Sequence, residues 1–220
     1  MRHYLQQHSV DVVLTRDGDY TPGNASPDYD LQARCDIANR AGADVFVSVH
    51  ADAALDPSAH GTTTYYYDGS AEGKKLAEML LAAVVSGTGL AASLPPQLVV
   101  LPDNFTPNLD GRGTKLSHFY VLKFTAMPAS LVEVAFISNP QEEAMLNDPA
   151  FQDAAGLAIA KGICDYLGVP WMADVNVPDW ARDAVMWAVS RGLINSQAGS
   201  EDFYRFITIL YRYDKLRGGC

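Results

Sequence analysis

The sequence predicts an α/β fold in which a mixed, mostly parallel sheet carries helices on both faces. The first observation is that short apolar runs alternate with helix-like segments over most of the chain. The second is that two of these runs each contain one polar group that is costly to bury, His50 in 43–53 and Glu133 in 130–136. Such groups at the carboxyl ends of strands lie where α/β sheets bind ligands.

The expected strands are short runs of β-branched, aromatic and other apolar residues. They cover residues 9–16, 43–53, 62–67, 98–101, 120–122 and 130–136. The expected helices begin at Asp, Ser or Asn caps and end near glycines. They start near residues 28–30, 70, 139 and 148, while 1–8 resembles the end of a further helix.

Composition divides the chain into three parts. Residues 1–168 form the predicted α/β domain, and 169–178, which contain two prolines and no helical period, form a linker. Residues 179–220 read as a tryptophan-containing helical hairpin. A unit of about 40 residues rarely holds a core alone, so we expect it to pack on the first domain, on a second copy or on a partner.

Charge and hydropathy exclude several functions. The net charge of −10 argues against nucleic-acid binding and against adsorption to anionic lipid. No apolar run approaches the roughly 20 residues that a membrane span requires, and no signal peptide is visible near Met1. The three cysteines lack metal-site spacing. We expect Cys35 and Cys164 to be core residues.

His50 and Glu133 together suit a zinc hydrolase. A neutral imidazole is a good zinc ligand, and a nearby carboxylate can take a proton from attacking water. The residues alone leave a second interpretation open, in which His50 is a hydrogen-bonded structural group. Glu133 is harder to explain structurally, because apolar residues surround it in the sequence.

Several blocks resemble the zinc-dependent N-acetylmuramoyl-L-alanine amidases of the amidase-3 type. These are Val13-Leu14-Thr15-Arg16, residues 31–39, Phe46-Val47-Ser48-Val49-His50-Ala51-Asp52-Ala53 and residues 127–139. The resemblance is collinear from Met1 to about Gly168. It implies cleavage of the amide between N-acetylmuramic acid and L-alanine in peptidoglycan. It also implies that His50 is a zinc (Zn2+) ligand, and that Glu133 is the general base toward zinc-bound water and then the acid toward the leaving amine.

The chain departs from this family pattern at its start. Members normally begin with a strand, a His-Gly-Gly turn and a glutamate that supply the other two zinc ligands, and neither residue is present. We therefore expect an N-terminally truncated amidase, marginally stable and weakly active or inactive, or a catalytically defective remnant that binds the cell wall. We expect His3 and His8 to be solvated, and the family pattern gives His60 and His118 no ligand role.

The C-terminal hairpin resembles one S-layer-homology repeat in residues 177–188, 192–194, 203–205 and 210–212. This resemblance implies binding to a cell-wall polymer. The alternative is a tryptophan-rich helix that packs on the catalytic domain. The substrate implies a location in the cell wall or outside the cell. The choice between phage endolysin and bacterial autolysin, and the oligomeric state, stay open.

Overall fold

The computed structural model describes residues 1–22, 27–93, 98–101, 119–171, 177–194 and 199–218, with the backbone alone at 27–28 and 98–101. Its centre is a four-stranded sheet with the order β1–β4–β2–β3. The strands are β1 (Phe46–Asp52), β2 (Thr63–Tyr67), β3 (Leu98–Leu101) and β4 (Ala129–Phe136). β1 runs parallel to β4 and β2 runs parallel to β3, whereas β2 and β4 are antiparallel. The predicted mixed, mostly parallel sheet is confirmed.

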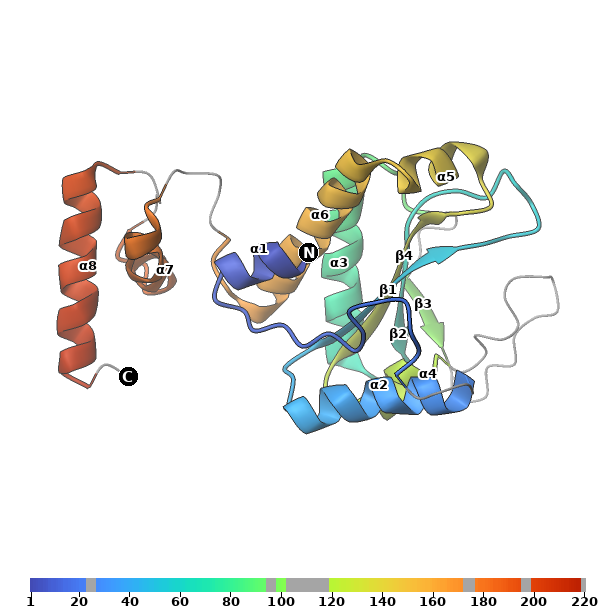
Figure 1. The fold of residues 1–220 in the computed structure, drawn as a ribbon, viewed down its shortest axis with the longest axis horizontal. Coiled ribbons are helices and arrows are strands. Elements are labelled where there is room, and N and C mark those ends of the chain that lie inside the picture. Colours follow the sequence, from blue (N-terminus) through green and yellow to red (C-terminus); the bar gives the residue numbers. More distant parts are fainter. Residues whose placement is uncertain (23–26, 94–97, 102–118, 172–176, 195–198, 219–220) are drawn as a thin grey trace.

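Helices cover both faces of this sheet (Figure 1). On one face, α3 (Ala71–Thr88) and α6 (Pro149–Leu167) build a core that includes Leu76, Leu80 and Ile159. On the other face, α2 (Pro27–Ala41) and α4 (Tyr120–Phe124) enclose a smaller cluster around Cys35 and Leu131. Two short helices complete the body, α1 (Arg2–Gln7) and α5 (Pro140–Leu146). Cys35 and Cys164 are both fully buried, as predicted.

Helix ends follow the local sequence signals. The side chains of Ser70, Asn139 and Asp148 accept hydrogen bonds from backbone N–H groups in the first turns of α3, α5 and α6. These bonds satisfy donors that have no partner within the helix. α6 ends at Gly168, which has the left-handed φ of 68° that favours glycine at this position.

The predicted strand at 9–16 is wrong. Residues 9–16 contain no strand, and β1 is an edge of the described sheet. The chain leaves α1 through Ser9 at a positive φ of 57°. Val10 and Val12 then pack on the core around α3 and α6, while Val13 is 59% exposed. These apolar residues therefore pack on the core without the backbone hydrogen bonds to a neighbouring strand that define a β-strand.

The predicted strand at 120–122 is also wrong, because these residues begin helix α4. A short apolar run fits a strand or a buried helical turn equally well. Here Val121 and Leu122 are buried, and the Tyr120 hydroxyl donates to Gln32 Oε1 on α2 at 2.6 Å. Packing against α2 therefore decides the conformation.

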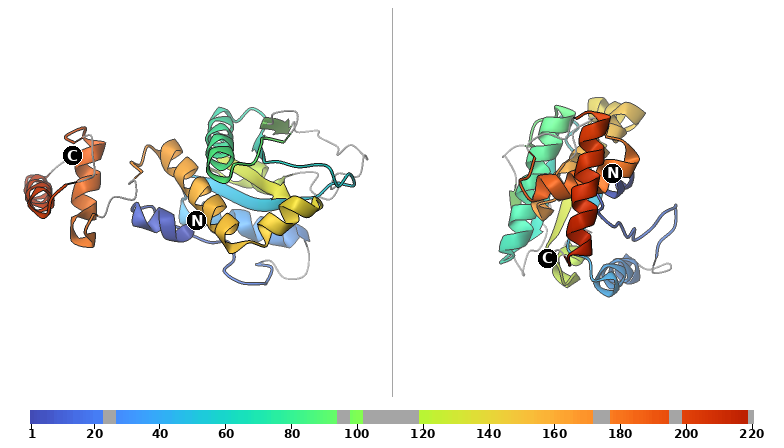
Figure 2. Two further views of the ribbon diagram at one scale, coloured as in Figure 1. Left: turned by 90° about the horizontal axis from the view of Figure 1, so that it is seen from above. Right: turned by 90° about the vertical axis from the view of Figure 1, so that its left-hand side faces the viewer.

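The C-terminal residues form a helical hairpin at one end of the molecule, on the side of α1 and α6 (Figures 1 and 2). Its elements are the 3₁₀ turn η2 (Asp179–Ala181), α7 (Arg182–Ser190) and α8 (Glu201–Leu216). Buried side chains from both helices form a cluster of their own, including Ala184, Val185, Tyr204 and Ile207. No helix within the described ranges is long and apolar enough to span a bilayer.

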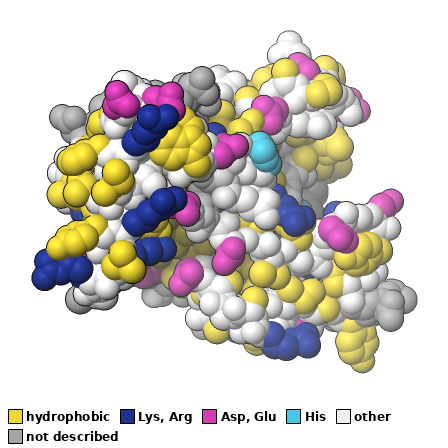
Figure 3. Space-filling model, turned by 60° about the vertical axis from the view of Figure 1, so that its left-hand side comes forward, with side chains coloured by type: hydrophobic (Ala, Val, Ile, Leu, Met, Phe, Trp, Pro, Cys, Tyr) yellow, Lys and Arg dark blue, Asp and Glu magenta, His cyan; other side chains and the backbone are white. Residues whose placement is uncertain are grey.

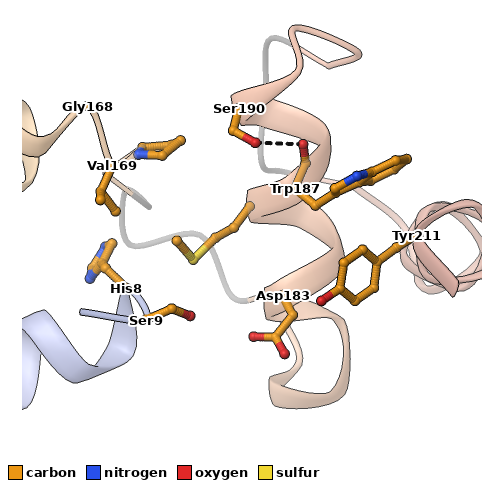
Figure 4. A pocket seen from close by; sticks show the side chains of 10 residues that line it. His8, Ser9, Gly168, Val169, Asp183, Trp187, Ser190 and Tyr211 are labelled. Carbon is orange, nitrogen blue, oxygen red and sulfur yellow. Dashed lines mark hydrogen bonds between the residues drawn. The ribbon is translucent and has the colours of Figure 1, made fainter. Parts of the chain in front are cut away.

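His3 is exposed as expected, but the expectation that His8 is solvated is wrong. His8 is only 4% exposed, and its ring stacks on Trp171 at 4.0 Å between centroids. Its Nδ1 lies 2.7 Å from the carbonyl oxygen of Tyr4. Burial of an apolar ring face against tryptophan offsets the loss of water. His8 lines a hollow between the body and the hairpin, together with Asp183 and Tyr211 (Figure 4).

Candidate active site

The two polar residues that interrupt the strands lie side by side. His50 of β1 and Glu133 of β4 are direct partners in the parallel register. Side chains alternate along a strand, so register partners share one face of the sheet. Phe46 and Ala129, an even number of residues earlier on the same strands, point to the same face of the sheet and belong to the cluster under α2 and α4. The pair therefore lies on the α2 side of the sheet, with His50 near the carboxyl end of β1 and Glu133 within β4.

Glu133 is a buried carboxyl group. It is 3% exposed, and its Oε2 is buried with no hydrogen-bond partner among the residues that the structure describes. Burial, followed by the negative charge of Asp52, raises the pKa of Glu133 to about 8. A carboxyl with a pKa near neutrality can both accept and return a proton, which is the requirement for general acid–base catalysis.

The surroundings of His50 lower the pKa of its imidazole and so favour the neutral ring. The His50 residue is exposed at the edge strand, while desolvation of its imidazole is the largest cause that lowers the pKa of this ring. The positive charges of Arg34 and Arg16 lower that pKa further. The ring Nε2 lies 2.9 Å from the Ser48 hydroxyl on the same strand. A neutral imidazole keeps a lone pair available for a metal or a proton.

An ion pair on α2 that was not predicted from the sequence borders this site. Arg34 Nε donates to Asp30 Oδ2 at 2.9 Å, and both side chains are largely buried. Asp30 Oδ1 is buried without a partner. The spacing of an acidic and a basic residue four apart on a predicted helix was the available signal.

Hydrogen bonds tie the loop after β1 to the end of β4. Asp52 accepts from the Ile137 N–H at 2.7 Å through its backbone oxygen. Farther along, the buried Glu142 carboxylate accepts from two backbone N–H groups, those of Gly61 at 2.7 Å and Phe136 at 2.6 Å. Glu142 therefore anchors residues 53–61 beside the strand that carries Glu133.

The residues that the structure describes do not complete a zinc site. A catalytic zinc needs three protein ligands as a rule. Within the described ranges, no three His, Cys, Asp or Glu side chains are grouped so that they could hold a metal. His50 fits one position of such a site by its chemistry, and Glu133 has a free buried oxygen. The described residues thus supply His50 as one of the usual three ligands.

Of the other two histidines that the sequence offered, the structure describes His60 alone. His60 is exposed, and its Nδ1 lies 2.8 Å from the Ser58 carbonyl oxygen. His118 lies outside the described residues. The described site thus combines one imidazole with one buried carboxyl group.

The fold and this pair define an α/β domain in which an imidazole and a buried carboxyl group lie on neighbouring parallel strands. The chain belongs to the amidase-3 family, whose model, described as N-acetylmuramoyl-L-alanine amidase, matches residues 1–165. The family and the fold that the sequence predicted are confirmed by this match.

Individual relatives agree with the family. The chain is 32% identical over 193 residues to the N-acetylmuramoyl-L-alanine amidase AmiA of Escherichia coli, covering 76% of this chain and 64% of AmiA. It is 32% identical over 177 residues to the endolysin of Bacillus phage SPP1, covering 78% of this chain and 55% of the endolysin. The chain therefore spans less than two thirds of the length of either relative.

A solved structure shows the same architecture. The catalytic domain of CwlV, an N-acetylmuramoyl-L-alanine amidase from Bacillus (Paenibacillus) polymyxa var. colistinus, aligns with a TM-score of 0.60 at 32% identity. The alignment covers 77% of this chain and 79% of that domain. The α/β body, rather than the C-terminal hairpin, is the part that the family model covers.

Proposed function

We propose that this protein acts on peptidoglycan and hydrolyses the amide bond between N-acetylmuramic acid and L-alanine. Membership of the amidase-3 family and the relatives named as amidases support the substrate class. The observation that carries the proposal is the pairing of His50 with Glu133, a buried carboxyl whose pKa is about 8. This is the placement that proton transfer to and from a substrate amide requires.

In this proposal Glu133 takes a proton from the attacking water and later gives it to the leaving amine of alanine. Burial makes the Glu133 carboxylate a stronger base than an exposed carboxylate, because desolvation disfavours its charged form. His50, kept neutral by its surroundings, would be one ligand of the Zn2+ ion that the family resemblance implies. Bound zinc would polarise the amide carbonyl and lower the pKa of water.

A second candidate function is binding to the cell wall without cleavage. It is favoured because the described residues bring a single imidazole to Glu133, which is short of the usual three ligands. In that case the protein would still bind peptidoglycan, and Glu133 would transfer no proton. Either function places the protein in the cell wall or outside the cell.

We further propose that the hairpin of residues 179–220 binds a cell-wall polymer, following its resemblance to an S-layer-homology repeat. Trp180 supports this role, because half of the residue is exposed and its ring could contact a sugar. Trp187 instead packs within the hairpin, 5.8 Å from the Tyr211 ring. Co-sedimentation of the full chain with purified walls tests this: Trp180→Ala should release protein into the supernatant, whereas Leu55→Ala should not.

One experiment separates the two candidate functions. The chain and its Glu133→Gln variant are titrated with zinc by calorimetry, and each is then incubated with purified peptidoglycan. The hydrolase proposal expects new alanine amino termini from the wild type and none from Glu133→Gln, with equal wall binding by both. Wall binding without new amino termini from either protein would favour the second candidate.

A further inference from the structure

Arg34 of α2 borders the site of His50 and Glu133 and carries hydrogen-bond donors that no described residue uses. Its Nε donates to Asp30 Oδ2 at 2.9 Å, and its side chain is 19% exposed. A guanidinium group has five N–H donors. No hydrogen bond or ion pair joins Nη1 or Nη2 of Arg34 to another residue that the structure describes. These two nitrogens are therefore available to a ligand.

The position of Arg34 along α2 places it on the active-site side of the sheet. Residues three and four positions apart share one face of a helix. Arg34 lies three positions after Leu31 and four before Ala38, and both of these pack in the cluster between α2 and the sheet. Phe46, in the same cluster, shares its face of β1 with His50. Arg34 thus lies on or beside the helix face that packs on this side of the sheet (Figure 1).

Charges make the two sides of the candidate active site electrostatically different. Desolvation is the largest cause of the pKa shifts of both His50 and Glu133, and charges add to it. The positive charges of Arg34 and Arg16 lower the pKa of His50 further. The negative charge of Asp52 raises the pKa of Glu133 further. The field is therefore positive on the His50 side, where Arg34 lies, and negative on the Glu133 side.

This positive side contrasts with the protein as a whole, which carries a net charge of −10. On the face that Figure 3 shows, basic side chains lie singly or in small groups among acidic ones. Near His50, the charge of Asp30 balances one of the two arginine charges, and the charge of the other remains in excess. An anion is therefore attracted locally to the α2 side of the site.

A carboxylate is the anion that best matches the free edge of Arg34. The planar guanidinium can form two parallel hydrogen bonds to the two oxygens of a carboxylate. The bond from Nε to Asp30 already restrains the guanidinium, so less conformational freedom is lost when a ligand binds. If the protein cleaves an amide at the amino end of a peptide, as proposed above, the carboxylates lie on the peptide side of that bond. The residue after alanine is the first that can carry a free carboxylate within the peptide.

We propose that Arg34 is a specificity-determining residue that binds the free carboxylate of the residue after alanine in the substrate peptide. Asp30 is a positioning residue, because it holds Nε and leaves both Nη groups to the ligand. This inference rests on the proposed function, since it assumes that the peptide lies across His50 and Glu133. It adds a preference for an acidic peptide over its amidated form, because an amide offers one acceptor oxygen and no charge.

Calorimetry with two synthetic peptides tests this preference. Both are N-acetylmuramoyl-L-alanyl dipeptides with an amidated end, and the residue after alanine is glutamate in one and glutamine in the other. The full chain carries Glu133→Gln throughout, so that neither peptide is cleaved. We expect the glutamate peptide to bind about tenfold more tightly, and adding Arg34→Gln should make the two affinities equal. Arg40→Gln is the matched control on the same helix; the Arg40 side chain is 75% exposed, and this variant should keep the preference.

A second substitution guards against a folding defect. Arg34→Gln removes the ion-pair partner of the largely buried Asp30 and so costs stability. Arg34→Lys keeps a positive charge there but lacks the planar pair of donors, so the preference should fall to about threefold or less. An undiminished preference in either variant, equal affinities before Arg34 is changed, or no binding of either peptide would overturn the proposal. A chain that shows the preference but releases no amino termini from peptidoglycan would contradict the proposed hydrolysis and leave this inference standing.

Discussion

His50 and Glu133 face each other across the parallel pair of β1 and β4. One belongs to an edge strand and stays partly open to solvent, while the other belongs to a strand that is buried along its whole length. A solvent-facing imidazole therefore borders a desolvated carboxyl group. Desolvation, together with the charges of Arg34 and Arg16, lowers the pKa of His50, and desolvation, together with the charge of Asp52, raises the pKa of Glu133. The raised pKa of Glu133 leads to the first prediction.

The stability of the metal-free protein should depend on pH through Glu133. The folded protein holds this proton more tightly than the unfolded chain, because the pKa rises from its ordinary 4.5 to about 8. The contribution of Glu133 to stability is therefore fully present below about 4.5 and is lost as pH rises to about 8. At pH 8.5 the free energy of unfolding of Glu133→Gln should therefore exceed that of the wild type by an amount on the order of a few kcal/mol.

Denaturant unfolding in a chelator at pH 5 and pH 8.5 measures this effect. Glu133→Gln should gain stability over the wild type at the higher pH and much less at the lower pH. Glu143→Gln changes an exposed carboxyl on α5, and we expect no comparable gain from it. Equal behaviour of the two variants at both pH values would contradict the buried carboxyl described here.

Glu142 should be important for stability. Its carboxylate accepts the N–H groups of Gly61 and Phe136, and truncation would leave both buried donors unpaired, at about 1–3 kcal/mol each. We expect Glu142→Ala to lower the free energy of unfolding by about 2–5 kcal/mol. Its neighbour Glu143 is exposed, so Glu143→Ala is the matched control and should stay within about 0.5 kcal/mol of the wild type.

Hydrogen exchange gives a local measure of the same anchor. Amide protection at Gly61 and Phe136 should fall in Glu142→Ala, while protection in the core of α6 should fall only as far as global stability does. Unchanged protection at both amides would show that other contacts hold the loop.

The α3–α6 contact should dominate the stability of the body. Leu80 of α3 is fully buried in the core that these helices share. Leu80→Ala should cost about 2–5 kcal/mol through lost burial and the cavity that remains. Leu157 of α6 is 37% exposed, and Leu157→Ala should cost much less. Thermal unfolding of the two variants compares them, and similar losses would be inconsistent with this core.

Local signals in the sequence were sufficient for much of the fold. Caps such as Asn139 and Asp148 were identifiable because they act within one helical turn. The 120–122 segment was assigned wrongly because its conformation depends on packing against α2, a long-range contact. The burial of His8 likewise depends on Trp171, which is distant in the sequence. Such contacts leave no trace in hydrophobic periodicity.

For the candidate site, the sequence indicated that His50 and Glu133 end or interrupt strands, and the structure adds that they are register partners. The sequence did not indicate that Glu142 would anchor the loop, because a glutamate in the first turn of a helix is common for electrostatic reasons alone. The expectation that the chain is marginally stable and weakly active stays a prediction.

The central proposal is that this chain cleaves the amide next to N-acetylmuramic acid and that Glu133 transfers the proton. Its most direct test is the release of alanine amino termini from purified peptidoglycan, with and without added zinc, by the wild type and by Glu133→Gln. The account predicts slow, zinc-dependent release by the wild type and none by Glu133→Gln. Equal release by both proteins, or release that a chelator leaves unchanged, would contradict it.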